Sequence, residues 1–129
     1  MSGRVLLDTN ILIALLAGDA AVIRALTSIE EVFVPAVALG ELHFGALKSA
    51  RPAENIARIE DLAAASAILV CDAESAREYG RIKNRLRERG RPLPENDIWI
   101  AAVTRQHGLS LVTRDEHFTE IEDISTLRW

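Results

Sequence analysis

The stretch Val5-Leu6-Leu7-Asp8-Thr9-Asn10 decides how this sequence folds. Three apolar residues run directly into an acid, a hydroxyl and an amide, and residues 11–17 are again all apolar. A short unbroken apolar run is typical of a strand buried on both faces of a parallel sheet, and the longer run that follows favours a helix. Asp8 is therefore predicted where a central strand ends and a helix begins, at the edge of an α/β sheet where ligands bind.

Strands and helices are predicted to alternate along the rest of the chain. Further apolar runs predict strands at residues 31–34, 67–71 and 109–113, and residues 124–127 predict a short edge strand. Helices are predicted between them, over about residues 20–28, 36–49, 53–65, 73–89 and 97–108. This alternation predicts an α/β fold with a central parallel sheet flanked by helices on both faces, and no linker or internal repeat divides residues 1–129.

Length and composition are those of one globular domain, with 49% hydrophobic and 26% charged residues in 129. The longest apolar run is too short to span a membrane, and the first residues do not resemble a signal peptide. We therefore expect a cytoplasmic protein without membrane contact. Cys71 is the only cysteine, which excludes an internal disulfide and fits a reducing compartment, and we expect its thiol to be buried and inert.

The net charge of −4 conceals one strongly basic segment. Residues 77–91 hold seven basic and two acidic side chains, so the rest of the chain is markedly acidic. Four arginines recur at every fourth position of the predicted helix: Arg77, Arg81, Arg85 and Arg89. Such a face either contacts the phosphates of a nucleic acid or is simply solvated, and the sequence leaves both readings open.

Four acids are predicted to approach the same edge of the sheet. Asp8 and Asp115 follow predicted strands, and Glu41 lies in the helix after the second strand. Asp97 opens a helix after a proline-containing loop. Taken singly, each has an ordinary explanation: Asp8 and Asp97 as helix caps, Asp115 as a turn residue, Glu41 as a solvated side chain. Their arrival at one edge favours a common site.

Electrostatics indicates what such a site would hold. Two carboxylates about 4 Å apart repel by about 4 kcal/mol at an effective dielectric constant near 20, so four of them require protons or a cation. A set of oxygen ligands suits Mg²⁺ or Mn²⁺ rather than Zn²⁺, and His43, His107 and His117 are not spaced as a zinc-binding set. A divalent cation there would activate water and stabilise displacement at a phosphate.

Four stretches, taken together, resemble the PIN-domain family, specifically VapC-type toxins of bacterial type II toxin–antitoxin systems. They are residues 5–12, 35–42, 96–102 and 111–115, the last followed by Phe118, in the order and spacing of that family. The resemblance implies an Mg²⁺-dependent endoribonuclease that also accepts Mn²⁺, with strand order 3-2-1-4-5. It further implies a homodimer that is inhibited by a cognate VapB-type antitoxin. The acidic quartet of the family corresponds to Asp8, Glu41, Asp97 and Asp115.

Roles follow from these positions. Asp8 and Asp97 are expected to hold the principal metal ion, with Glu41 and Asp115 completing the cluster. Thr9, Asn10 and Thr113 are candidates for hydrogen bonds to the carboxylates or to phosphate oxygens, although Thr113 reads equally well as an ordinary strand residue.

The first helix suggests where a partner binds. Because residues 11–17 include no polar side chain, an apolar strip beside the acids is expected to remain for the C-terminal part of an antitoxin. That amphipathic segment is expected to lie against this helix and its neighbour at residues 20–28, with Leu12 and Leu16 as contacts. The alternative is that this helix is buried entirely within its own chain.

Two other functional classes are weighed against the ribonuclease. A phosphatase of the haloacid-dehalogenase type needs a second aspartate two residues after the first, and Asn10 occupies that position. A catalytically silent PIN-like binding module would be expected to have lost some of the four acids, and all four are present.

Overall fold

The computed structural model describes residues 3–129, and its sheet contains five parallel strands. The strands are β1 (Arg4–Leu7), β2 (Glu31–Pro35), β3 (Ala67–Leu69), β4 (Ser110–Val112) and β5 (Ser125–Leu127). Their order is β3-β2-β1-β4-β5, and Val5 of β1 pairs with Val32 on one side and Ser110 on the other. The predicted fold class and strand order are confirmed.

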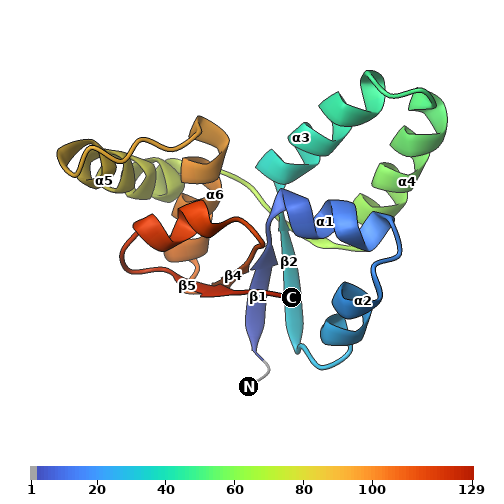
Figure 1. The fold of residues 1–129 in the computed structure, drawn as a ribbon, viewed down its shortest axis with the longest axis horizontal. Coiled ribbons are helices and arrows are strands. Elements are labelled where there is room, and N and C mark those ends of the chain that lie inside the picture. Colours follow the sequence, from blue (N-terminus) through green and yellow to red (C-terminus); the bar gives the residue numbers. More distant parts are fainter. Residues whose placement is uncertain (1–2) are drawn as a thin grey trace.

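Six α-helices and one 3₁₀ helix connect the strands. They are α1 (Thr9–Leu16), α2 (Ala20–Leu26), α3 (Ala36–Leu47), α4 (Pro52–Ala64), α5 (Ala73–Glu88), α6 (Glu95–Gln106) and the 3₁₀ helix η1 (Glu116–Glu120). In Figure 1, α5 and α6 lie on one side of β1 and β2, and α1 and α2 lie on the other. Helices α1 and α3 begin at the carboxyl ends of β1 and β2, so the carboxyl edge is surrounded by helix starts.

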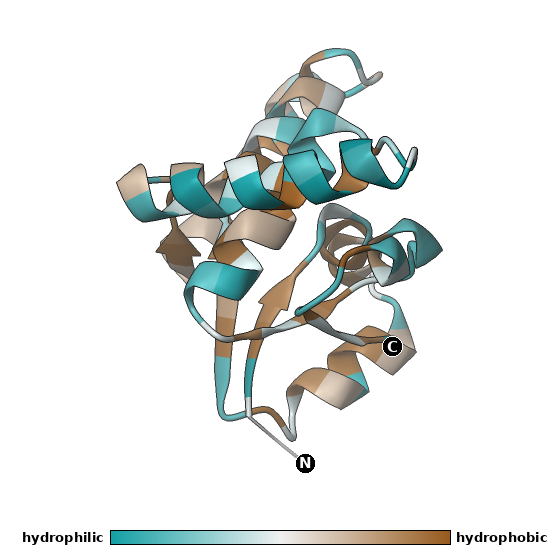
Figure 2. Ribbon diagram, turned by 90° about the vertical axis from the view of Figure 1, so that its left-hand side faces the viewer, coloured by the Kyte–Doolittle hydropathy of each residue, from teal (hydrophilic) through white to brown (hydrophobic). Residues whose placement is uncertain are grey.

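The core explains why the central strand is apolar from Val5 to Leu7. Val5, Leu6 and Leu7 are each exposed by 2% or less, because strands and helices cover both faces of β1. Figure 2 shows the strands in brown and the long helix α5 mostly in teal, so the hydrophobic layer lies inside and the charged helix faces water. The rigid strand β1 therefore ends at Asp8 in a fixed position.

Three expectations about local structure are wrong. Helix α6 begins at Glu95, two residues before Asp97, and Pro94 stands at its N-cap without a side-chain hydrogen bond. Glu95 and Asp97 both lie in the first turn, where negative side chains interact favourably with the helix dipole. The third strand ends at Leu69 rather than at Cys71. The Cys71 thiol is consequently exposed rather than buried.

Within residues 3–129, no single helix is long and apolar enough to cross a membrane. Helices α1 and α2 reach that length and hydropathy only when taken together, and the chain bends by 106° between them.

Candidate metal centre

Asp8 is buried at the junction of β1 and α1. Its Oδ1 accepts a hydrogen bond from the Thr9 backbone N–H at 2.8 Å and so caps α1, while its Oδ2 accepts one from the Thr113 hydroxyl at 2.7 Å. The side chain is only 4% exposed, and this burial raises the pKa of the carboxyl, with nearby Glu41 and Asp115 adding to the increase. The capping reading of Asp8 is correct, and the same residue also belongs to the acidic cluster.

A hydrogen-bond network joins Asp8 to the loop after β4. The Thr113 hydroxyl accepts from the Asp115 backbone N–H at 3.0 Å while it donates to Asp8. The Asn10 amide approaches both the Asp8 carboxylate, at 3.3 Å, and the Thr113 hydroxyl, at 3.4 Å. The Asn10 side-chain Oδ1 accepts a hydrogen bond from the Arg114 backbone N–H at 3.2 Å. Asn10 and Thr113 thus hold the two strand ends, and their acids, in a fixed relation.

Glu41 reaches the site from α3. The Thr9 hydroxyl donates to Glu41 Oε1 at 2.5 Å, which links the first turn of α1 to the second turn of α3. This is the position that the sequence predicts for Thr9, beside a carboxylate of the cluster. Its specific partner, 32 residues away, is not readable from the pattern.

Asp97 projects from the first turn of α6 and is the most strongly perturbed acid. Partial burial, followed by the charges of Asp8, Asp115 and Glu41, raises its pKa from 3.8 to about 6, and His117 opposes the increase. The structure therefore brings all four predicted acids close enough to repel one another. Excess negative charge on oxygen ligands is the condition that a divalent cation relieves, so this set fits Mg²⁺ or Mn²⁺.

Asp115 caps η1 and brings a histidine with it. Its Oδ1 accepts from the His117 backbone N–H at 2.9 Å and lies 3.2 Å from His117 Nδ1. One ligand atom each from Asp97, Asp115 and His117 can be chosen so that all three lie within 4.8 Å of one another. The sequence does not single out His117. Its three histidines are not spaced as a zinc-binding set, and no pattern predicts the short helix η1.

Arg114, which the sequence does not single out either, holds the loop that carries Asp115 in place through two hydrogen bonds. Its guanidinium donates to Asp19 Oδ2 at 3.0 Å and to the Trp129 carbonyl oxygen at 2.8 Å. Asp19 in turn caps α2, which lowers the pKa of its carboxyl, chiefly through the Val22 N–H and then through Arg114. The loop is therefore tied both to the α1–α2 turn and to the segment after β5.

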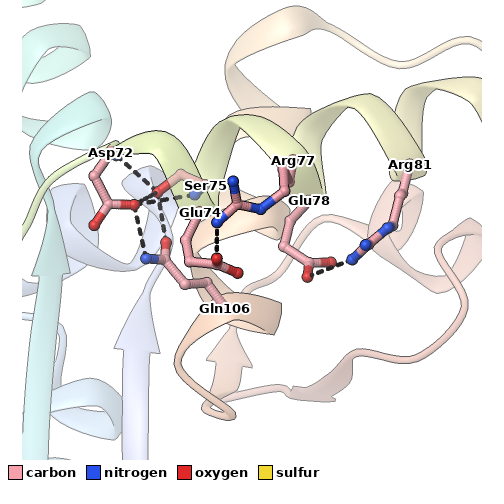
Figure 3. Close-up of polar contacts among 7 residues, drawn as sticks. All are labelled: Asp72, Glu74, Ser75, Arg77, Glu78, Arg81 and Gln106. Atoms are coloured by element: carbon pink, nitrogen blue, oxygen red, sulfur yellow. Dashed lines mark hydrogen bonds and ion pairs between the residues drawn. The ribbon is translucent and has the colours of Figure 1, made fainter.

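The four arginines of α5 each have a partner within the chain. Arg77 pairs with Glu74 and Arg81 with Glu78, as Figure 3 shows. Arg85 binds Glu122 at 2.6 Å, and the Arg89 guanidinium donates to the Glu120 carbonyl oxygen at 2.8 Å. The first turn of this helix is held by a capping box between Asp72 and Ser75, also drawn in Figure 3. Whether these arginines also contact RNA stays a prediction.

The two leucines that the sequence assigns to a partner differ in burial. Leu12 is completely buried, so its predicted role as an antitoxin contact is wrong: α1 turns that side into the core. Leu16 lines a groove of about 330 Å³ between α1, α3 and α4, and Glu41 is among the residues that line it. Ile13, 55% exposed, lines the same groove, which α3 and α4 complete rather than α2.

Comparison with known proteins assigns the fold to a family. The model of the PIN domain matches residues 5–124. Ribonuclease VapC2 of Haemophilus influenzae is 35% identical, and the tRNA(fMet)-specific endonuclease VapC of Shigella flexneri is 33% identical, each match covering 96% of both chains.

Solved structures agree with these relatives. The DNA-bound VapBC structure from Salmonella typhimurium matches with a TM-score of 0.89 at 30% identity, over 100% of this chain and 99% of that one. VapBC-5 of Mycobacterium tuberculosis matches with a TM-score of 0.79 at 31% identity, over the whole of both chains. The chain therefore belongs to the PIN-domain family and, within it, to the VapC group.

Proposed function

We propose that this chain is a metal-dependent endoribonuclease and the toxin of a VapBC-type toxin–antitoxin pair, with residues 1–129 as one PIN domain. The observation that carries the proposal is the convergence of four carboxyl groups at the carboxyl edge of the sheet, where burial and then the charges of the other three acids raise the pKa of Asp97 to about 6. Relatives that match over nearly their whole length are named ribonucleases, which supports RNA as the substrate.

The proposed centre is built from two kinds of residue. Asp8 and Asp97 hold the ion, and Glu41 and Asp115 complete the negative cluster. A bound Mg²⁺ or Mn²⁺ lowers the pKa of water and stabilises charge that develops on the phosphate. The chain's own groups supply orientation: Thr9 fixes Glu41, and Thr113 fixes Asp8 at 2.7 Å. No side chain is then needed as a nucleophile.

RNA binding is proposed to use the arginine-rich face of α5, formed by Arg77, Arg81, Arg85 and Arg89. Support comes from the concentration of positive charge there in a chain whose net charge is −4. Each arginine now binds a carboxylate or a carbonyl oxygen, so RNA phosphates would compete with these internal partners.

The proposed partner is a VapB-type antitoxin, which matched structures such as VapBC-1 of Haemophilus influenzae support. We assign its C-terminal part to the groove lined by Ile13, Leu16 and Ala17, because this groove is largely apolar and also includes Glu41 of the acidic cluster. A basic side chain of the antitoxin beside Glu41 would neutralise the carboxylates. We further propose a homodimer that becomes heteromeric with the antitoxin, in the cytoplasm, where the exposed Cys71 would stay reduced.

Cleavage assays with purified protein test the function. Wild type should cut single-stranded RNA with Mg²⁺ or Mn²⁺ and stop with EDTA. Asp97→Asn should lose most of the activity but keep the fold, because Asp97 is not the N-cap of α6 and the amide has nearly the same shape. Asp61→Asn, an exposed acid on α4, is the matched control and should cut normally. Undiminished cutting in EDTA would refute the metal mechanism, and absence of cutting by the wild type with every metal would refute the ribonuclease.

A further inference from the structure

His117 is a nitrogen ligand placed beside a centre that is otherwise made of oxygen. It comes from η1, two residues after Asp115, and its Nδ1 lies 3.2 Å from Asp115 Oδ1. Ligand atoms of His117, Asp97 and Asp115 lie within 4.8 Å of one another. The imidazole side chain is 62% exposed, so packing does not enclose its ring.

The spacing of these three atoms is close to that of ligands on one ion. Donor atoms that each lie about 2.1 Å from a metal ion are at most about 4.2 Å apart. The 4.8 Å that bounds the three atoms exceeds this limit by about 0.6 Å at most.

The backbone of His117 is anchored by its neighbours, although its side chain is exposed. Its N–H donates to Asp115 Oδ1 at 2.9 Å, and the next residue, Phe118, is completely buried in the core. The histidine is therefore held at the edge of the cluster by the fold of η1. An exposed imidazole on an anchored backbone, beside two carboxylates, is placed to add a nitrogen ligand to an ion in the site.

We propose that His117 is a direct ligand of the bound ion and makes this centre prefer Mn²⁺ to Mg²⁺. This rests on the proposed function, because it specifies the metal of the same site. Imidazole nitrogen is a good ligand for first-row transition ions, whereas Mg²⁺ selects oxygen and water. A site of carboxylates alone would not make that distinction so strongly.

Pulsed electron paramagnetic resonance of Mn²⁺ bound to the protein tests the ligand directly. The wild type should show hyperfine coupling to one ¹⁴N nucleus, and incorporation of ¹⁵N-histidine should change that coupling without any mutation. His117→Gln should abolish it. His43→Gln is the matched control, since His43 pairs with Glu60 away from the cluster, and should leave the coupling intact.

Affinities for the two metals provide the second measurement. In calorimetric titrations of the protein without RNA, His117→Gln should weaken Mn²⁺ binding about tenfold and change Mg²⁺ binding less than twofold, since loss of a group at a metal site costs about 10–100-fold. His43→Gln should match the wild type for both ions. Should His117→Gln fail to fold, the ¹⁵N-labelled wild type still decides the question.

Two results would overturn the inference. Mn²⁺ that binds without nitrogen coupling, or equal weakening of Mn²⁺ and Mg²⁺ in His117→Gln, would make His117 only a support for Asp115; the ribonuclease would stand. A wild type that binds neither ion would overturn the metal-dependent function and this inference together.

Discussion

At the scale of single residues, Asp97 is an acid whose pKa is raised far above that of an ordinary aspartate. Its pKa of about 6 arises first from burial and then from the neighbouring carboxylates Asp8, Asp115 and Glu41. In the unfolded chain the same group titrates near 3.8. Between these values the folded state binds more protons than the unfolded state, so the stability of the metal-free protein falls as pH rises from about 4 to about 6 and stays low above that.

Asp97→Asn should therefore stabilise the metal-free protein at pH 7.5, because it removes the repelled charge. The whole shift in pKa corresponds to about 3 kcal/mol, and solvent screening of this half-exposed group reduces the expected gain to about 1 kcal/mol. Thermal or urea unfolding in EDTA measures it. The gain should disappear near pH 4, where the wild-type carboxyl is protonated as well. A variant no more stable than the wild type at pH 7.5 would show that the carboxylates do not repel as described.

Metal binding should depend on pH in the opposite direction. The ion and the proton compete for Asp97, so the affinity of the wild type for Mn²⁺ should weaken about tenfold for each pH unit below about 6. Calorimetric titration between pH 5 and pH 7.5 follows this. Asp97→Asn should bind weakly throughout, with a shallower pH dependence. An affinity of the wild type that is flat across this range would mean that Asp97 is not a ligand.

At the scale of elements, the arginine-rich face of α5 has two candidate roles, RNA binding and ion pairing within the chain. Arg89 binds the Glu120 carbonyl oxygen at the end of η1, and Arg85 binds Glu122 just after it, so the face has an internal structural role. These ion pairs are exposed and contribute little to stability individually. Their replacement should consequently leave the fold intact and report on RNA binding alone.

Changing Arg81, Arg85 and Arg89 together to Gln should weaken binding of single-stranded RNA and flatten its dependence on salt. Loss of three phosphate contacts reduces the slope of log affinity against log salt by about two units, at about 0.7 per contact. Binding is measured with Asp97→Asn as background, so that the RNA stays uncut. The exposed Arg24→Gln on α2 is the control. An unchanged slope would assign this face to internal ion pairs only.

The elements also show which parts of the site are readable from sequence. Asp8 is predictable because an apolar strand that runs into an acid marks the carboxyl edge of the sheet. The partners of Thr9 and Arg114 are not, because each lies on an element distant in sequence. The burial of Leu12 is not readable either, because a run of residues that is apolar at every position does not indicate which side of the helix faces the core. His117 was missed because the short helix η1 has no periodic pattern.

At the scale of the whole molecule, the groove between α1, α3 and α4 places the proposed antitoxin beside the acids. Leu16→Glu should fold, because Leu16 is only half-buried at the groove, and should cut RNA but resist the antitoxin. Leu12→Glu should unfold, since it puts a charge into a completely buried position. Circular dichroism and cleavage with and without antitoxin measure both. A folded Leu16→Glu that remains fully inhibited would place the partner elsewhere.

The position of β1 between β2 and β4 has a consequence for synthesis of the protein. Asp8 is made early, yet its hydroxyl partner Thr113 follows 105 residues later, and its backbone N–H bonds to Val112. The nascent chain therefore has no complete metal centre as long as β4 and the residues after it are still inside the ribosome. The residues that line the groove, from Ile13 to Ile59, all emerge before that point. We expect the nascent chain to be open to capture by its inhibitor before it becomes able to cut RNA.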